Sequence, residues 1–164
     1  MIIRPAKKED IEQIYNLFLE LYKEEDNSAK KTAKFLKNLR KKRKDFEKSV
    51  KKELLKGIRE RNSIYLVAEI DNKLVGYCYG QFTKTKDPFF KPSTIGYLHS
   101  IIVNRKFRGK GIAKKLHQEI IEWFKKKKCS TIYLEVFVNN SAISLYKGWN
   151  YKTATCKMWR NIYD

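Results

Sequence analysis

The chain has 164 residues, a length typical of one domain, and we expect residues 1–164 to form a single domain. Hydrophobic residues make up 42% and aromatic residues 13%, which is too much for a disordered chain. No apolar stretch approaches the roughly 18 residues of a membrane-spanning helix, and Met1–Pro5 is too short for a secretory signal. The three cysteines are far apart and odd in number, which indicates free thiols in a reducing compartment. We therefore expect a cytoplasmic protein with no membrane partner.

The formal net charge of +19 is concentrated in one segment. Lys30–Arg59 holds 14 Lys and Arg residues against three acidic ones, a net of +11. A basic face of this kind can bind an anionic partner such as nucleic acid or a ribosome. Lysine greatly outnumbers arginine, however, and few aromatic side chains lie in the segment to stack on bases, as single-strand binders require. We therefore favour a solvated helix face and keep the nucleic-acid contact as the alternative.

The N-terminal third is predicted to be one strand followed by two helices. Residues 2–4 are typical of a short strand that ends at a proline. Apolar residues recur at intervals of three and four over Ile11–Tyr22, which predicts an amphipathic helix to about residue 25, ended by Asp26–Ser28. A second, longer helix is predicted from there to about Asn62. Its narrow apolar stripe consists of Phe35, Leu39, Phe46, Val50, Leu54 and Ile58.

Strands are predicted for the middle of the chain. Ser63–Ile70 and Leu74–Phe82 should pair as a hairpin around the tight turn Asp71–Lys73. Lys84–Ser93 contains two prolines and no periodicity, which predicts a loop. Thr94–Val103 is rich in aliphatic residues on both faces, as expected for a strand near the middle of a sheet.

Helices and strands alternate in the rest of the chain. We predict a helix over Ile112–Lys128, a strand over Thr131–Val138, a short helix over Ser141–Trp149 and a last strand or hairpin over Tyr151–Ile162. The order β-α-α-β-β-β-α-β-α-β indicates a mixed α/β fold. Its sheet should be mostly antiparallel, with Thr94–Val103 and Thr131–Val138 as a parallel pair joined by a helical crossover.

A glycine-containing loop carries the clearest chemical signal. Gly109 and Gly111 have no side chains, so backbone N–H groups can turn toward one point. The helix that follows leaves its first four N–H groups unpaired at its positive end, which favours a phosphate. Nearby positive charge comes from Arg105, Lys106, Arg108, Lys110 and Lys114. The spacing is not that of a P-loop, and the acidic ribose ligand of a Rossmann site is missing. By itself the loop indicates only an anion at a helix N-terminus.

Two segments resemble the GNAT superfamily of acyl-CoA N-acyltransferases. Val103–Leu116 is similar to motif A of that family. Its signature Arg/Gln-x-x-Gly-x-Gly/Ala is matched by Arg108, Gly111 and Ala113. Asn139–Tyr146 is similar to the family's Asn-x-x-Ala-x-x-Leu-Tyr segment. The Gly-Phe pair that usually follows is replaced by Asn150–Tyr151, a mild departure because Asn is the next best residue for a left-handed helix end. With the order of elements, the resemblance covers nearly the whole chain.

The resemblance implies acetyl-CoA as co-substrate. The backbone of Ile101, Ile102 and Val103 would pair with the pantetheine arm like an added strand, and Asn139 would bind the pantetheine end. The pyrophosphate would lie beside Arg108, held by the N–H groups of Gly109, Lys110, Gly111, Ile112, Ala113 and Lys114. Tyr146 matches the tyrosine that protonates the departing CoA thiolate in many members. A phenol with a pKa of about 10 is a sensible proton donor to a thiolate.

The acceptor amine must be neutral to attack, and three residues are candidates for its base. By the resemblance, Tyr97 falls where several relatives carry a catalytic Glu or Tyr, and His99 where polyamine-acetylating relatives carry a carboxylate. Glu135, expected on the neighbouring parallel strand, falls where N-terminal-amine acetyltransferases carry a base. The plain alternatives are packing for Tyr97, an ion pair with a lysine for Glu135 and a satisfied buried imidazole for His99. The choice of base among these three residues and water stays open. We interpret His117 as structural.

We therefore predict transfer of an acetyl group from acetyl-CoA to a primary amine by direct attack in a ternary complex. A protein N-terminus, a lysine or a peptide is the favoured acceptor. The alternatives are a small amine or polyamine, and a non-catalytic acyl-CoA-binding module. No cluster of His, Cys or Asp has metal-ligand spacing, so no metal is expected. We expect a monomer or a homodimer.

Overall fold

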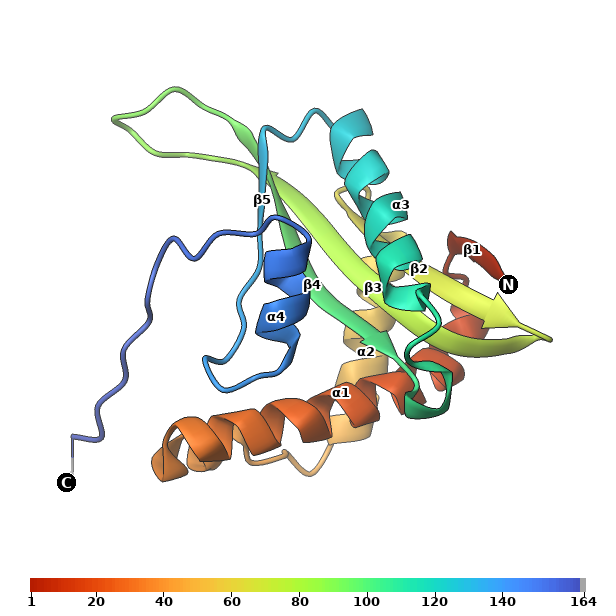
Figure 1. Ribbon diagram of the computed structural model, residues 1–164, viewed down its shortest axis with the longest axis horizontal. Coiled ribbons are helices and arrows are strands. Elements are labelled where there is room, and N and C mark those ends of the chain that lie inside the picture. Colours follow the sequence, from red (N-terminus) through yellow and green to blue (C-terminus); the bar gives the residue numbers. More distant parts are fainter. Residues whose placement is uncertain (163–164) are drawn as a thin grey trace. The chain divides into compact units, whose positions relative to one another are not determined.

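The computed structural model (Figure 1) describes residues 1–162. The chain divides into two compact units. The first unit consists of Met1–Leu21 and Lys44–Leu134, and the second of Tyr22–Arg43 and the residues from Glu135 onward. The long helix α1 (Ile11–Thr32) begins in the first unit and ends in the second.

The first unit is built on a five-stranded sheet in the order β1-β2-β3-β4-β5. Neighbouring strands are antiparallel from β1 to β4, and β4 and β5 are parallel. This confirms the mixed α/β fold with one parallel pair. The strands are β1 (Ile2–Pro5), β2 (Ser63–Ile70), β3 (Lys73–Lys84), β4 (Thr94–Val103) and β5 (Thr131–Tyr133).

The β2–β3 hairpin forms where its turn residues predict it. Asp71 and Asn72 have φ values of 48° and 60°, the left-handed conformation that the central residues of a type I′ turn adopt. This turn matches the twist of the two strands and pairs Ile70 with Lys73. A β-bulge at Ala68/Glu69 then shifts the register by one residue, which places Leu66 opposite Cys78 and Ile64 opposite Gly80.

Helix α3 (Ile112–Lys126) packs on one face of the sheet, against β3 and β4. Its buried residues Ile120 and Phe124 lie over glycines of these two strands. A Cβ atom would lie 2.6 Å from Ile120 at Gly80 and 2.7 Å from the Phe124 ring at Gly96. The helix can therefore approach the sheet this closely only because both strand positions lack a side chain.

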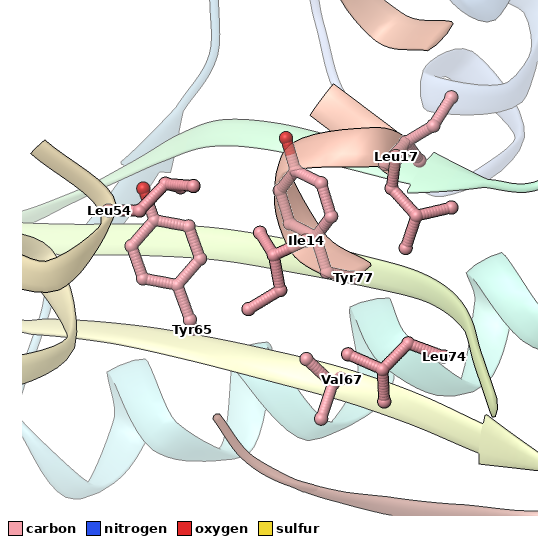
Figure 2. Close-up of a cluster of buried hydrophobic side chains, with 8 residues drawn as sticks. Ile14, Leu17, Leu54, Tyr65, Val67, Leu74 and Tyr77 are labelled. Atoms are coloured by element: carbon pink, nitrogen blue, oxygen red, sulfur yellow. The ribbon is translucent and has the colours of Figure 1, made fainter. Parts of the chain in front are cut away.

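Helix α2 (Phe46–Arg59) and the first half of α1 pack on the opposite face. Figure 2 shows the core between them, in which Ile14 and Leu17 of α1 and Leu54 of α2 lie near side chains of the sheet. The sheet residues of this core are Tyr65, Val67, Leu74, Tyr77 and Ile102. The predicted core faces of the helices are thus confirmed in this unit.

The boundary between the first two predicted helices is wrong. α1 continues through Asp26–Ser28 to Thr32, and the Ser28 hydroxyl donates to the Glu24 carbonyl of the same helix at 3.0 Å. Arg40 also pairs with Asp26 at 2.5 Å, which holds that acidic residue on the helix surface. A local turn preference is overridden here by contacts made later in the chain.

The long second helix is also wrong, because the segment is interrupted. A 3-10 helix (Lys34–Arg40) and α2 are separated by Lys41–Asp45, and Lys41 has extended backbone angles. Five consecutive basic residues, Arg40 to Lys44, fall at this break, and like charges three and four apart destabilise a helix. The basic segment is therefore not one helix face, and its two parts lie in different units.

The C-terminal strands are shorter than predicted. β5 ends at Tyr133, where its register with β4 ends opposite Tyr97, so Glu135 lies beyond the strand. α4 (Ala142–Gly148) forms where the short helix was predicted. From Tyr151 to Ile162, where the described residues end, there is no strand, so the predicted last strand or hairpin is wrong. A strand needs a partner, and none pairs with this segment there.

Among the helices of residues 1–162, none has the length and apolar character needed to cross a bilayer.

Candidate functional site

The glycine-containing loop joins β4 to α3 in the first unit. Gly109 and Gly111 have φ values of 77° and 75°, and Gly111 is the N-cap of α3. No neighbouring heavy atom lies within 4 Å of where a Cβ would stand at either position. Glycine is therefore required by the left-handed backbone, which costs other residues about 1–2 kcal/mol, rather than by crowding. The space beside the loop is therefore open at both glycines.

The start of α3 offers N–H groups to an anion. Its first helical hydrogen bond runs from Lys115 N–H to Gly111 O at 3.1 Å, so the N–H groups of residues 112–114 lie in the unpaired first turn. The positive end of the helix dipole lies at the same point. Both features, with the open space at the two glycines, fit the pyrophosphate of acetyl-CoA.

The loop is fastened to the end of β4 and to α1. Arg108 Nε donates to the Val103 carbonyl at 2.8 Å, which closes the loop over its own strand. Asn104 Oδ1 accepts from Lys106 N–H at 3.1 Å, and its Nδ2 donates to Glu20 Oε1 at 2.7 Å. Neither Asn104 nor Glu20 was predicted from the sequence as part of this site. The preference of Asn for an N-cap position was the available signal for the first, and nothing local pointed to the second.

The end of β4 has one strand beside it in this sheet. Ile101, Ile102 and Val103 pair with residues of β3 on one side. On the other side β5 pairs only with Ile95–Tyr97, so within the described sheet no strand continues along the end of β4. A strand edge without a neighbouring strand can pair with an extended chain carrying amides, such as pantetheine.

A row of rings in contact crosses the sheet beside this edge, with three stacked pairs and one tilted pair, Tyr97–His99. The centroid distances are 4.1 Å for Tyr65–Tyr79, 4.6 Å for Tyr79–His99, 3.9 Å for His99–Tyr97 and 4.5 Å for Tyr97–Tyr133. We call these five residues the aromatic row. It draws on β2, β3, β4 and β5 and brings Tyr97 and His99 into contact, as expected for residues on one face of a strand.

The position of His99 depends on a β-bulge. The register passes from Tyr79–Ser100 to Gly80–Leu98, so His99 is the extra residue of β4. Its Nε2 lies 3.3 Å from Gln81 Oε1, a contact that the sequence did not reveal. Burial lowers the pKa of His99 from its ordinary value, because the charged imidazolium is poorly solvated there. The imidazole is therefore neutral at neutral pH and able to accept a proton.

Tyr146 lies on α4 in the second unit. Its ring meets Trp149 and Tyr151 edge to face, each at a centroid distance of 5.9 Å. Burial, with a smaller contribution from the charge of Glu25, raises the pKa of Tyr146 to about 12. The phenol therefore keeps its proton at neutral pH, as a proton donor must.

The end of α4 is a Schellman motif. Asn150 has a φ of 66°, its N–H donates to the Lys147 carbonyl at 3.0 Å, and Tyr151 N–H donates to the Tyr146 carbonyl at 3.0 Å. The ring contact between Tyr146 and Tyr151 is the apolar contact that accompanies this motif. The expectation that Asn serves as the left-handed helix end is confirmed.

Glu135 and Asn139 also belong to the second unit. The Glu135 side chain is 62% exposed and pairs with Lys157 at 3.4 Å. Its predicted place on a strand is wrong, and its ion pair matches the plain alternative for this residue. Asn139 Nδ2 donates to Thr32 Oγ1 at 3.4 Å. Its predicted contact with pantetheine stays a prediction.

Two further expectations concern His117 and metals. His117 is buried on α3, and burial lowers its pKa, which agrees with a structural role. Over residues 1–162, no group of three or more His, Cys, Asp or Glu side chains is arranged to hold a metal ion.

Comparison with known proteins gives matches along nearly the whole chain. Residues 11–151 match the acetyltransferase (GNAT) family. A segment of 66 residues is 38% identical to N-alpha-acetyltransferase 30 of Saccharomyces cerevisiae, and covers 40% of this chain and 38% of the yeast protein.

Solved structures share the fold at low sequence identity. A tetramutant of the BH1408 protein of Bacillus halodurans is 19% identical, with a TM-score of 0.83 over 99% of this chain and 100% of that one. The aminoglycoside N-acetyltransferase AAC(6')-Iy in complex with CoA is 15% identical, with a TM-score of 0.70 over 98% of each chain.

Proposed function

Because this chain belongs to the acetyltransferase (GNAT) family, we propose that it transfers an acetyl group from acetyl-CoA to the primary amine of a peptide or protein. The N-terminal α-amine is the first candidate acceptor, since the curated relative with 38% identity over 66 residues is named an N-alpha-acetyltransferase. The match spans 38% of that protein, so its substrate is carried here as a proposal.

The glycine-containing loop supports acetyl-CoA as the acyl donor. The N–H groups from Gly109 to Lys114 would hold the pyrophosphate, with the positive charge of Lys110 and Lys114 beside them. The free edge of β4 at Ile101–Val103 would pair with the pantetheine arm, and Asn139 would bind its far end. When bound, acetyl-CoA supplies the acetyl thioester that the acceptor nitrogen attacks.

His99 is our first candidate for the base. The acceptor must lose a proton, and a neutral imidazole of lowered pKa accepts one readily at neutral pH. Tyr97, in ring contact with His99, would share in this transfer directly or through water. Glu135 is the alternative, and its exposure and its ion pair with Lys157 make it the weaker candidate.

Tyr146 is proposed to protonate the departing thiolate. Its phenol keeps its proton far above neutral pH, because burial raises its pKa to about 12. It also occupies the tyrosine position of the Asn-x-x-Ala-x-x-Leu-Tyr segment. Direct attack by the amine needs no acetylated side chain, so the reaction would proceed in a ternary complex.

One observation carries this proposal. The end of β4, with which an amide-bearing arm can pair, is followed by a loop whose two left-handed glycines lead directly to the N-terminus of α3. The test is release of CoA thiol from acetyl-CoA with panels of peptides, lysine-containing proteins and small amines. We expect peptide N-termini to give the largest kcat/KM. Acetyl-CoA binding without turnover on any panel would contradict the proposal and favour the non-catalytic module.

A small-molecule amine is the second candidate acceptor. The aminoglycoside N-acetyltransferase in complex with CoA has the same fold along 98% of the chain, which favours keeping this class. A net charge of +19 weakens it for polyamines and aminoglycosides, because these acceptors are themselves polycations. Higher kcat/KM for aminoglycosides than for any peptide in the same panel would decide for this class.

We also propose a cytoplasmic location. Cys78, Cys129 and Cys156 are free thiols, which suits a reducing compartment. Monomer and homodimer both stay open as states in solution, and sedimentation analysis would distinguish them.

A further inference from the structure

A carboxylate, an amide and an imidazole form a hydrogen-bonded series in the first unit. Gln81 Nε2 donates to Glu60 Oε2 at 3.4 Å, and Gln81 Oε1 lies 3.3 Å from His99 Nε2. An ionised carboxylate can only accept, so the Gln81 amide nitrogen must face Glu60 and its oxygen must face the imidazole. An amide oxygen also only accepts. The Nε2 atom of a neutral His99 therefore carries the ring proton, and Nδ1 has the lone pair.

Each member of this series is held in place by its own contacts. Glu60 is the C-cap residue of α2, and its N–H donates to the Lys56 carbonyl at 3.0 Å. Gln81 pairs with Ser63 and Tyr97 in the sheet. The His99 ring lies between Tyr79, at 4.6 Å and 19°, and Tyr97, at 3.9 Å. Stacking limits the tilt of the ring, but it does not determine which nitrogen carries the proton, because both tautomers have the same shape.

We propose that Gln81 is a positioning residue of the acetyl transfer, whose amide holds His99 as the Nε2–H tautomer and leaves Nδ1 to take the acceptor's proton, while Glu60 fixes the direction of that amide. This inference rests on the proposed function of His99. Nδ1 takes one proton from the acceptor nitrogen as the nitrogen lone pair forms the amide bond. The C–S bond breaks with its electron pair on sulfur, Tyr146 protonates the sulfur, and imidazolium and phenolate exchange protons with water.

An amide between the carboxylate and the imidazole has a particular advantage. A carboxylate in direct contact would stabilise the imidazolium and raise the pKa of His99, whereas a neutral amide orients the ring without adding a full charge. The groups facing His99 are the phenols of Tyr79 and Tyr97 and the Gln81 amide. Beyond them lie Glu60 and, 3.7 Å from its Oε1, Lys56 Nζ, with Glu53 acting on Tyr79 from α2. Burial lowers the pKa of His99, and the neutral amide beside the ring does not raise it again.

The first test exchanges the two side chains in the double variant Glu60→Gln/Gln81→Glu. Net charge and hydrogen-bonding capacity are kept, but the carboxylate now contacts the imidazole. The acid limb of kcat/KM, which reports the free enzyme's base, should move to higher pH by about one unit or more. An acid limb at the same pH in an active double variant would overturn the proposal.

The second test removes the amide oxygen that accepts the imidazole's hydrogen bond, in the variant Gln81→Leu. We expect kcat to fall about tenfold or more with the KM for acetyl-CoA unchanged. Gln118→Leu, at an exposed position on α3, is the matched control and should leave both constants unchanged. Loss of acetyl-CoA binding in Gln81→Leu, together with loss of turnover, would mean a structural role and overturn the proposal.

A third measurement is made on the wild-type protein and does not depend on turnover. Nitrogen chemical shifts of the imidazole in ¹⁵N-histidine-labelled wild-type protein, with His99 assigned from His99→Gln, report the tautomer directly. The Nε2–H form is expected, and a protonated Nδ1 in the neutral ring would overturn the proposal. If the Nε2–H form is found but His99→Gln leaves kcat unchanged, the assignment of His99 as base is wrong, while the failure of all acceptors in the panel would instead reject the proposed function.

Discussion

The ring centroids of Tyr97 and His99 lie 3.9 Å apart, although residues two apart on one strand face are separated by about 6–7 Å along the backbone. The β-bulge at His99 and the stacking of each ring on a further tyrosine bring them together. The two candidate residues for proton removal therefore share one partly buried environment, and a change in either ring alters the surroundings of the other.

Stability should depend on the protonation of His99. Its folded pKa is below the unfolded value of about 6.5, so the unfolded chain takes up the proton first. The stability that the neutral ring contributes is present above pH 6.5 and is lost as the pH falls from there through the folded pKa. Urea unfolding between pH 5 and 8 should show a free energy of unfolding that declines more steeply for wild type than for His99→Gln. Parallel curves for the two proteins would contradict this, and the comparison removes the similar contribution of His117.

Tyr146→Phe should remove the proposed proton donor while keeping the packing of the ring. We expect kcat to fall about tenfold or more under saturating substrates, with the KM for acetyl-CoA unchanged and the free energy of unfolding altered by less than about 1 kcal/mol. Tyr151→Phe, which alters the neighbouring phenol, is the control and should keep its kcat. Unchanged turnover in Tyr146→Phe would exclude the proposed role.

Gly111→Ala should separate backbone conformation from crowding at the loop. The alanine meets no atom within 4 Å but must adopt a φ of 75°, so we expect a loss of about 1–2 kcal/mol in the free energy of unfolding and a higher KM for acetyl-CoA. Gly111→Asn should recover part of the loss, because Asn tolerates the left-handed region better. Both quantities can be followed by urea unfolding and steady-state kinetics. An alanine variant with wild-type stability would mean that the loop adopts another conformation.

Gly96→Ala should be destabilising for the opposite reason. Its Cβ would lie 2.7 Å from the Phe124 ring, so α3 or the ring must move, at a cost of about 1–3 kcal/mol. Gly148→Ala is the matched control, since no atom lies within 4 Å of its Cβ and the residue ends helix α4. Thermal unfolding of the two variants should show a lower Tm only for Gly96→Ala. Relief of the loss by Phe124→Leu in the same chain would identify the ring as the cause.

Asn150→Gly and Asn150→Ala should have different effects on the free energy of unfolding. Glycine adopts a φ of 66° without strain and should leave the free energy of unfolding unchanged or slightly higher, whereas alanine should lower it by about 1 kcal/mol. Because Tyr151 and Tyr146 are joined by this helix end, the alanine variant should also lower kcat. Equal stabilities of the two variants would show that the Schellman motif contributes nothing measurable.

The local elements could be predicted where their information is local. The left-handed residues Asp71 and Asn72 mark the hairpin turn, and β2 and β4 have the predicted bounds. The glycines at 109 and 111 and the asparagine at 150 occupy left-handed positions for the reason that their residue types suggest. The sequence by itself therefore determined the strand–loop–helix that resembles a CoA site and the helix end that carries Tyr146.

Only the tertiary structure decided the rest. α1 runs past Asp26, which pairs with Arg40 fourteen positions later, and the pairing of β5 with β4 ends at Tyr133. The neighbours of His99 likewise come from other strands and from the end of α2: Tyr79, Gln81 and Glu60 are brought to it by sheet register, by a bulge and by helix packing. Residues separated by roughly 20 to 40 positions become neighbours only when the strands pair. For this reason the sequence could present Tyr97, His99 and Glu135 as equal candidates, whereas the folded chain places Gln81 beside His99 and leaves Glu135 in an exposed ion pair with Lys157.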